Sequence, residues 1–185
     1  MPKLGMEPIR RAALVKATIV EVGAAGTLNI SVSQIAKRAG MSTALAHHYF
    51  GGKDQIFLAA MREILRQYRE EVLIALRRIP DRAEAIVTAS FAPSCFDSGT
   101  VSAWMSFYVQ AQTSPAALRL LRLYQRRLRS NLTHALRGQG VDPKGAADLL
   151  AALIDGVYIR RVFAARDTED GSKVLELLRT LKGAA

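Results

Sequence analysis

Residues 31–53, SVSQIAKRAGMSTALAHHYFGGK, have the pattern of two short helices joined by a tight turn. Ser31 is placed to accept a hydrogen bond from the backbone N–H of Gln34, whose side chain can reach back to Ser31 in a capping box. Gly40 supplies the left-handed residue that ends the first helix, and Ser42 is a favourable N-cap for the second. The pattern predicts a helix-turn-helix, whose second helix offers its N-terminal side chains to the major groove of DNA.

The charge of the chain favours a polyanionic partner. Among 185 residues there are 26 Lys and Arg against 16 Asp and Glu, which gives a formal net charge of +10. Residues 1–53 alone hold seven basic and two acidic side chains, which suits nucleic acid. The single cysteine, Cys95, excludes an internal disulfide framework. No stretch is long and apolar enough for a membrane helix, so we expect a soluble, cytoplasmic protein.

Helical periodicity continues along the chain and predicts an all-α fold of about nine helices. The expected helices outside the opening motif cover residues 8–25, 53–78, 82–91, about 102–111, 115–137, 146–165 and 174–182. Residues 92–100, APSCFDSGT, are predicted to form a loop, with Thr100 or Ser102 as the N-cap of the following helix. Gly23 lies inside the first helix at an expected cost of about 1 kcal/mol relative to alanine.

The opening motif also resembles a known family. The order of a first helix, SVSQIAKRAGMS, a short second helix and then His48, Tyr49, Phe50 and Lys53 is similar to the N-terminal domain of the TetR family of bacterial repressors. MPKLGMEPIRR at the N-terminus and LLAALIDGVYIR at 149–160 resemble members that respond to choline in the glycine betaine pathway. The resemblance implies a DNA-binding domain over residues 1–53 and a helical ligand-binding and dimerisation domain over 54–185.

The resemblance places the DNA contacts on the second helix of the motif and its neighbours. Hydroxyl groups at a helix N-terminus suit phosphates, and a lysine supplies a point charge for the DNA backbone. Many members of the family carry an aromatic residue at the position of His47. Adjacent helical residues point in different directions, so His47 and His48 are not expected to hold a metal. The expected DNA-binding residues are Lys3, Ser31, Ser42, Thr43, Ala44, His47, His48, Tyr49 and Lys53.

Trp104, Phe107 and Tyr108 lie at helical spacing and admit two interpretations. Spacing alone favours an aromatic core stripe, because aromatic side chains mostly bury area. The resemblance to choline-responsive repressors favours a cage for a quaternary ammonium group, which aromatic faces attract. Tyr158, Phe91 and Phe163 are further candidates for such a cage.

Asp155 is an acidic residue within the apolar segment LLAALIDGVYI. A buried carboxylate is costly unless it is paired. Its partner could be Arg160 or Arg161, a backbone cap or a cationic ligand. We therefore count Asp155 as a second-rank ligand candidate.

The last two expected helices have more apolar surface than one subunit easily covers. We expect residues 146–165 and 174–182 to pair with their copies in a homodimer that binds a palindromic operator. The arginines at 119, 122, 126 and 129 form either a solvated face or a second DNA surface.

The expected function is a ligand-responsive repressor of genes for glycine betaine synthesis, with choline as inducer. The alternative is a repressor of the same family that senses a different cationic or hydrophobic molecule, as a multidrug sensor does. The sequence holds no nucleophile triad, paired-carboxylate motif, phosphate loop or metal spacing, so neither an enzyme nor a bound cofactor or metal is expected.

Overall fold

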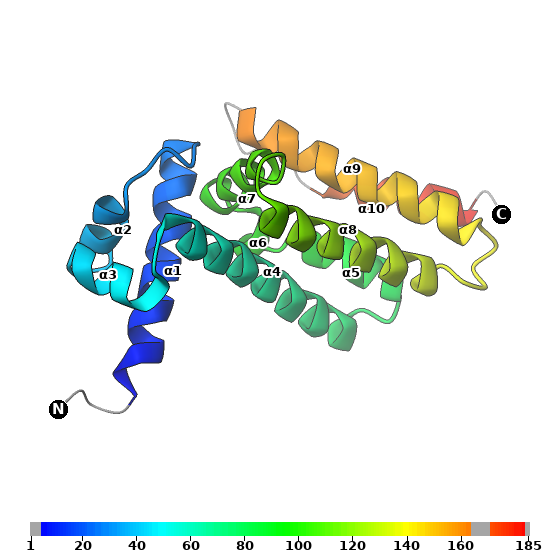
Figure 1. Cartoon of the computed structure of the whole chain (residues 1–185). Coiled ribbons are helices and arrows are strands. Elements are labelled where there is room, and N and C mark those ends of the chain that lie inside the picture. Colours follow the sequence, from blue (N-terminus) through cyan, green and yellow to red (C-terminus); the bar gives the residue numbers. More distant parts are fainter. Residues whose placement is uncertain (1–4, 164–170, 184–185) are drawn as a thin grey trace.

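The computed structural model describes residues 5–163 and 171–183, and these form ten α-helices without a strand (Figure 1). At the N-terminal end lie α1 (Met6–Ala25), α2 (Val32–Arg38) and α3 (Thr43–Phe50). The predicted capping box is present, because Ser31 Oγ accepts from the Gln34 N–H at 3.1 Å and Gln34 Oε1 accepts from the Ser31 N–H at 2.7 Å. Ser42 caps α3, and Gly40 adopts a left-handed φ of 67° in the turn. The local signals in residues 31–53 thus specify the predicted helices.

The remaining helices follow the predicted order. They are α4 (Lys53–Arg78), α5 (Arg82–Ser90), α6 (Pro93–Phe96), α7 (Ser98–Gln110), α8 (Pro115–Ala135), α9 (Pro143–Phe163) and α10 (Ser172–Gly183). Asp81 caps α5, with its carboxylate accepting from the N–H groups of Ala83 and Glu84. The predicted last residues of the helix ending at Ala165 lie outside the described part of the chain.

The prediction of a loop over residues 92–100 was wrong. Pro93 stands at the first position of the short helix α6, where its missing N–H costs nothing. The next helix is capped by Asp97, not by Thr100 or Ser102, because the Asp97 carboxylate accepts from the N–H groups of Gly99 and Thr100 at 3.0 and 3.1 Å. Helix α7 consequently starts at Ser98, earlier than expected.

One hydrophobic core joins the N-terminal helices to the rest of the molecule. It runs from Leu14 and Ile35 through Phe57 and Trp104 to Leu178. Helix α1 packs against both α4 and α7, and Figure 1 shows α1–α3 at one end of the molecule with α4 leading away from them. The positions of α3 and of the distal helices are therefore coupled through α1.

Gly23 permits the closest approach between α1 and α7. A Cβ atom at this position would overlap the backbone carbonyl of Gly99 near the start of α7. Gly23 was expected only to weaken its helix, whereas the structure shows that it also allows the close packing of α1 against α7.

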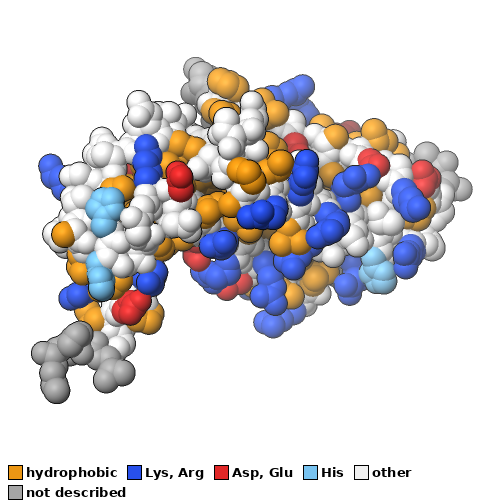
Figure 2. Space-filling view, in the orientation of Figure 1, with side chains coloured by type: hydrophobic (Ala, Val, Ile, Leu, Met, Phe, Trp, Pro, Cys, Tyr) orange, Lys and Arg blue, Asp and Glu red, His pale blue; other side chains and the backbone are white. Residues whose placement is uncertain are grey.

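Helix α9 leaves Leu149, Ile159 and Phe163 exposed, the last by 82% of its surface. Figure 2 shows the face that carries α4 and α8, where Lys and Arg side chains gather with hydrophobic side chains between them. Within the described residues, no helix has the length and apolar character needed to cross a membrane.

Candidate functional site

The exposed surface of α3 contains most of the residues expected to contact DNA. Ser42, Ala44, His47 and His48 are exposed, and Thr43 is half-buried at the first position of the helix. Ala46 is fully buried, so it anchors the opposite face of α3 to the core. The capped N-terminus and this division into two faces hold a small set of hydroxyl and imidazole groups outward.

Tyr49 has a different environment from the rest of this set. It is only 9% exposed, and its hydroxyl accepts a hydrogen bond from Arg10 Nη1 at 3.4 Å. The guanidinium of Arg11 lies over the rings of Tyr49 and Phe50, at 5.6 and 5.2 Å from their centroids. The tyrosine thus ties α3 to the start of α1 and is itself buried.

Lys53 is the first residue of α4, and its ammonium lies 5.4 Å from the centroid of the Phe57 ring. Ser31 is exposed, and its hydroxyl is engaged in the capping box. Lys3 lies outside the described residues. The expected DNA-binding residues that can be located therefore lie on or beside α2, α3 and the first turn of α4.

A second group of side chains, which we call the aromatic cluster, consists of Tyr68, Trp104, Tyr108 and Tyr124 from α4, α7 and α8. The ring of Trp104 meets those of Tyr108 and Tyr124 edge to face, with centroid separations of 5.4 and 5.2 Å. Tyr124 in turn meets Tyr68 at 5.8 Å. Edge-to-face contacts of this kind are favourable and fix the ring orientations.

Asp155 lies next to this cluster on α9. Its Oδ1 accepts a hydrogen bond from the Tyr108 hydroxyl at 3.1 Å, so Asp155 has a tyrosine partner that was not among those expected from the sequence. Burial raises the pKa of Asp155, and the Tyr108 hydrogen bond opposes that rise. Burial, followed by the nearby Asp155 charge, raises the pKa of Tyr108. The site therefore holds a half-buried carboxylate for which a cation would be a favourable neighbour.

Another aromatic group adjoins the aromatic cluster. Phe91, Phe96 and Tyr158 have pairwise centroid separations of 5.0 to 6.0 Å. The Tyr158 hydroxyl donates to the backbone carbonyl of Ser90, which fixes α9 against α5. Burial raises the pKa of Tyr158.

The structure brings together most, but not all, of the expected ligand residues. Trp104, Tyr108 and Asp155 are neighbours, with Tyr158 and Phe91 adjoining them. Phe107 is fully buried in the core and Phe163 is exposed, and neither takes part in the ring contacts found among the described residues.

Three aromatic members of the site were missed as candidates. Tyr68 and Tyr124 lie at helical spacing among apolar residues of the helices predicted over 53–78 and 115–137, and Phe96 falls in the segment predicted to be a loop. A stripe indicates that a side chain faces inward, but it does not identify the helix that it meets. Among residues 5–163 and 171–183, no cluster of three or more His, Cys, Asp or Glu side chains suited to a metal occurs.

Comparison with known proteins agrees with this architecture. Residues 14–60 match the family described as bacterial regulatory proteins of the tetR family, and residues 79–181 match that of the BetI-type transcriptional repressor C-terminal domain. A relative from Brucella abortus, named HTH-type transcriptional regulator BetI, is 43% identical over 185 residues, covering 96% of this chain and 92% of that protein. The chain belongs to the BetI-type repressors of the TetR family.

Further relatives bear the same name or the same fold. A BetI regulator from Agrobacterium fabrum is 49% identical over 166 residues, covering 86% of this chain and 80% of that protein. A crystal structure of a transcriptional regulator from Saccharomonospora viridis in complex with choline has a TM-score of 0.78 at 22% identity, covering 92% of this chain and 93% of that chain. The relatives are named as regulators, so this BetI-type repressor is not an enzyme, as predicted.

Proposed function

We propose that this BetI-type repressor binds a palindromic operator as a homodimer and responds to choline, controlling genes that convert choline to glycine betaine. The observation that carries the choline proposal is the half-buried Asp155 carboxylate, which accepts a hydrogen bond from Tyr108, a residue whose ring packs against Trp104 in the aromatic cluster.

Choline fits this chemistry because its quaternary ammonium is cationic and has no N–H group to donate. Such a cation is bound through aromatic faces and a carboxylate rather than through directed hydrogen bonds from the ammonium. The naming of the relatives as BetI and the choline complex of the structural relative from Saccharomonospora viridis support the same ligand.

The exposed face of α3 supports operator binding through the residues expected from the sequence. Two recognition helices in a twofold dimer would enter successive major grooves about 34–36 Å apart. The exposed apolar side chains of Leu149, Ile159 and Phe163 support pairing through α9, with α10 beside it.

The route from ligand to DNA runs through α7 and α1. Trp104 and Tyr108 belong to α7, the start of which packs against α1 at Gly99 and Gly23. Choline that favours one position of α7 would change the spacing of the two α3 helices. The size of this effect is limited by the difference in choline affinity between the two arrangements.

A gel-shift experiment on the intergenic DNA beside the gene, with and without choline, tests the proposal. We expect a discrete complex at moderate salt and a choline-dependent change in its affinity or mobility. Trp104 is the one tryptophan in the sequence, so the tryptophan fluorescence reports on the aromatic cluster. We expect its change on titration with choline to saturate. Silence toward choline together with saturation by a larger hydrophobic cation would instead support the multidrug-type sensor.

A further inference from the structure

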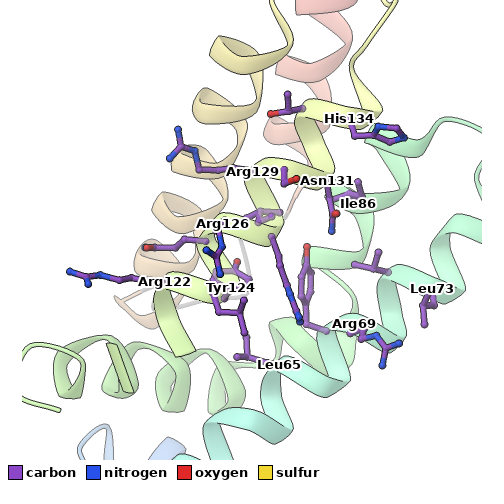
Figure 3. A pocket seen from close by; sticks show the side chains of 18 of the residues that line it. Leu65, Arg69, Leu73, Ile86, Arg122, Tyr124, Arg126, Arg129, Asn131 and His134 are labelled. Carbon is purple, nitrogen blue, oxygen red and sulfur yellow. The ribbon is translucent and has the colours of Figure 1, made fainter. Parts of the chain in front are cut away.

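A long groove lies between α4 and α8, with α5 and the start of α9 at its far end (Figure 3). Its volume is about 1520 Å³, which exceeds the 300–1,000 Å³ typical of small-molecule pockets. The groove overlaps the aromatic cluster at Tyr68 and Tyr124, whereas Trp104, Tyr108 and Asp155 do not line it.

The side chains around the groove are strongly cationic. Among the described residues its lining holds nine arginines and one lysine, against the single carboxylate of Asp148. Asp148 pairs with Arg129, and Arg66 pairs with Glu63 and Glu70 on its own helix. For the other eight basic side chains of the lining, no salt bridge is found within the described part of the chain. Most of the positive charge is therefore available to an anion from outside.

The same groove has a substantial apolar lining. Leu65, Val72 and Leu73 contribute from α4, Ile86 from α5, and Leu120 and Leu123 from α8. Leu73 remains 43% exposed, so its apolar surface has no complete cover within this protomer. Figure 3 shows Leu65, Arg69 and Leu73 on one wall and the labelled arginines of α8 on the other.

We propose that this groove binds a free anionic amphiphile, a molecule with one carboxylate or phosphate head group on a hydrocarbon chain. The arginines of α4 and α8 would hold the head group, and the leucine-rich lining would cover the chain. A nucleic-acid backbone matches the charge equally well, but it offers no hydrocarbon to cover the apolar lining. The combination of basic side chains without a salt bridge and apolar surface therefore favours an anionic amphiphile over nucleic acid as the ligand.

Binding in the groove is expected to reach the aromatic cluster. Tyr124 lies in the lining, and its ring is 5.2 Å from that of Trp104. A ligand that displaces Tyr124 would change the surroundings of the single tryptophan. The groove thus provides a second input to the repressor beside the proposed cation site, and it does not depend on choline being the cation.

Decanoate, kept below its micelle concentration, is a suitable probe for calorimetric titration of the full-length protein. We expect saturable binding of one decanoate per protomer, with a change in Trp104 fluorescence. The double variant Arg122→Gln/Arg126→Gln should bind decanoate about tenfold more weakly, because it removes two exposed arginines that would pair with the carboxylate of the ligand. The matched variant Arg78→Gln/Arg119→Gln removes two exposed arginines of the same helices that do not line the groove, and it should bind as the wild type does.

Comparison ligands separate the head group from the chain. Decanol and inorganic tripolyphosphate should each bind at least tenfold more weakly than decanoate. Leu73→Gln, at an exposed position on α4, should also weaken decanoate binding and provides an independent test of the groove. Asp155→Asn should leave decanoate affinity unchanged, which distinguishes this site from the proposed choline site.

Three results would overturn the proposal. The first is the absence of saturable decanoate binding. The second is equal decanoate affinity for the wild type and the Arg122→Gln/Arg126→Gln variant. The third is tripolyphosphate binding as tight as that of decanoate and equally sensitive to the same variant, which would identify the groove as a polyanion site.

Discussion

The α2–α3 segment and the aromatic cluster differ in how their residues are brought together. The first takes its exposed groups from one continuous stretch, residues 31–53, and each helix end there is fixed by a neighbouring side chain or glycine. The second draws Tyr68, Trp104, Tyr108 and Tyr124 from three helices and lies against Asp155 on a fourth. The shape of the α2–α3 segment depends on hydrogen bonds between residues close in sequence, whereas the shape of the aromatic cluster depends on how whole helices pack.

This difference matters for regulation. The segment that faces DNA is held by short-range capping, so it can move as a unit without losing its own shape. The cluster changes shape whenever α4, α7, α8 or α9 shifts, which is the behaviour expected of a ligand sensor. Helix α1 contacts α2, α3 and α7, so it is the physical connection between the two regions.

The largest effect is expected at that contact. Gly23→Ala places a Cβ atom against the Gly99 carbonyl and should lower the free energy of unfolding by about 1–3 kcal/mol, because neither backbone can move aside freely. Thermal unfolding measures this loss. Gly52→Ala is the matched control, since a Cβ atom there meets no neighbour within 4 Å. Equal melting temperatures for Gly23→Ala and Gly52→Ala would show that the two helices are not tightly joined.

The second effect concerns the cluster alone. Asp155→Asn should weaken choline binding about tenfold or more, because the partly desolvated carboxylate is lost, while operator affinity without choline is retained. Asp148→Asn, an exposed change on the same helix, should leave choline affinity unchanged. Equal choline affinity for the wild type and Asp155→Asn would remove Asp155 from the site.

The same residue predicts a pH dependence. Burial raises the pKa of Asp155, so choline affinity of the wild type should fall as the pH drops through that raised value and the carboxylate is protonated. The stability of the choline-free protein should change with pH in the opposite direction. The buried, ionised Asp155 destabilises the folded state at pH values above its raised pKa, and this destabilisation disappears below the ordinary pKa of an aspartate. Asp155→Asn should therefore be at least as stable as the wild type at pH 7, and any advantage should shrink toward pH 4.

A smaller effect is expected in the DNA-facing segment. Ser31→Ala removes the hydroxyl that caps α2 and should cost about 1 kcal/mol of stability. Ser33→Ala, an exposed change in the same helix, is the control for loss of a serine hydroxyl. Denaturant unfolding of the two variants gives the comparison, and equal midpoints would contradict the role of the capping box.

The smallest effect is electrostatic. Lys53→Ala should weaken operator binding modestly and for all sequences alike, and it should reduce the slope of log K against log salt by about 0.9, as expected for one lost phosphate contact. Lys173→Ala, on α10, should leave the slope unchanged. An unaltered slope for Lys53→Ala would show that this lysine makes no phosphate contact.

The sequence was informative wherever the signal was local. The capping box at Ser31, the cap at Ser42 and the glycine at 40 gave the helix-turn-helix with its boundaries, and helical periodicity gave the all-α fold. It was less informative about residues 92–100, because Pro93 and Asp97 serve equally well as loop residues and as helix starts.

The side-chain contacts of the candidate ligand site could not be predicted from the sequence pattern. Asp155 was identified as unusual because it interrupts an apolar segment, but its partner Tyr108 is 47 residues away along the chain. Similarly, the spacing of Tyr124 places it inside without showing that it meets Trp104 and Tyr68. Those pairings follow from helix packing, which no short sequence window contains.

The most direct test of the central claim, that the cluster and the DNA-facing segment are coupled, is the choline affinity of the repressor measured with and without its operator. We predict two different choline affinities, with a ratio equal to the factor by which choline changes operator affinity, as thermodynamic linkage requires. Identical choline affinities for the free and the operator-bound protein would contradict it.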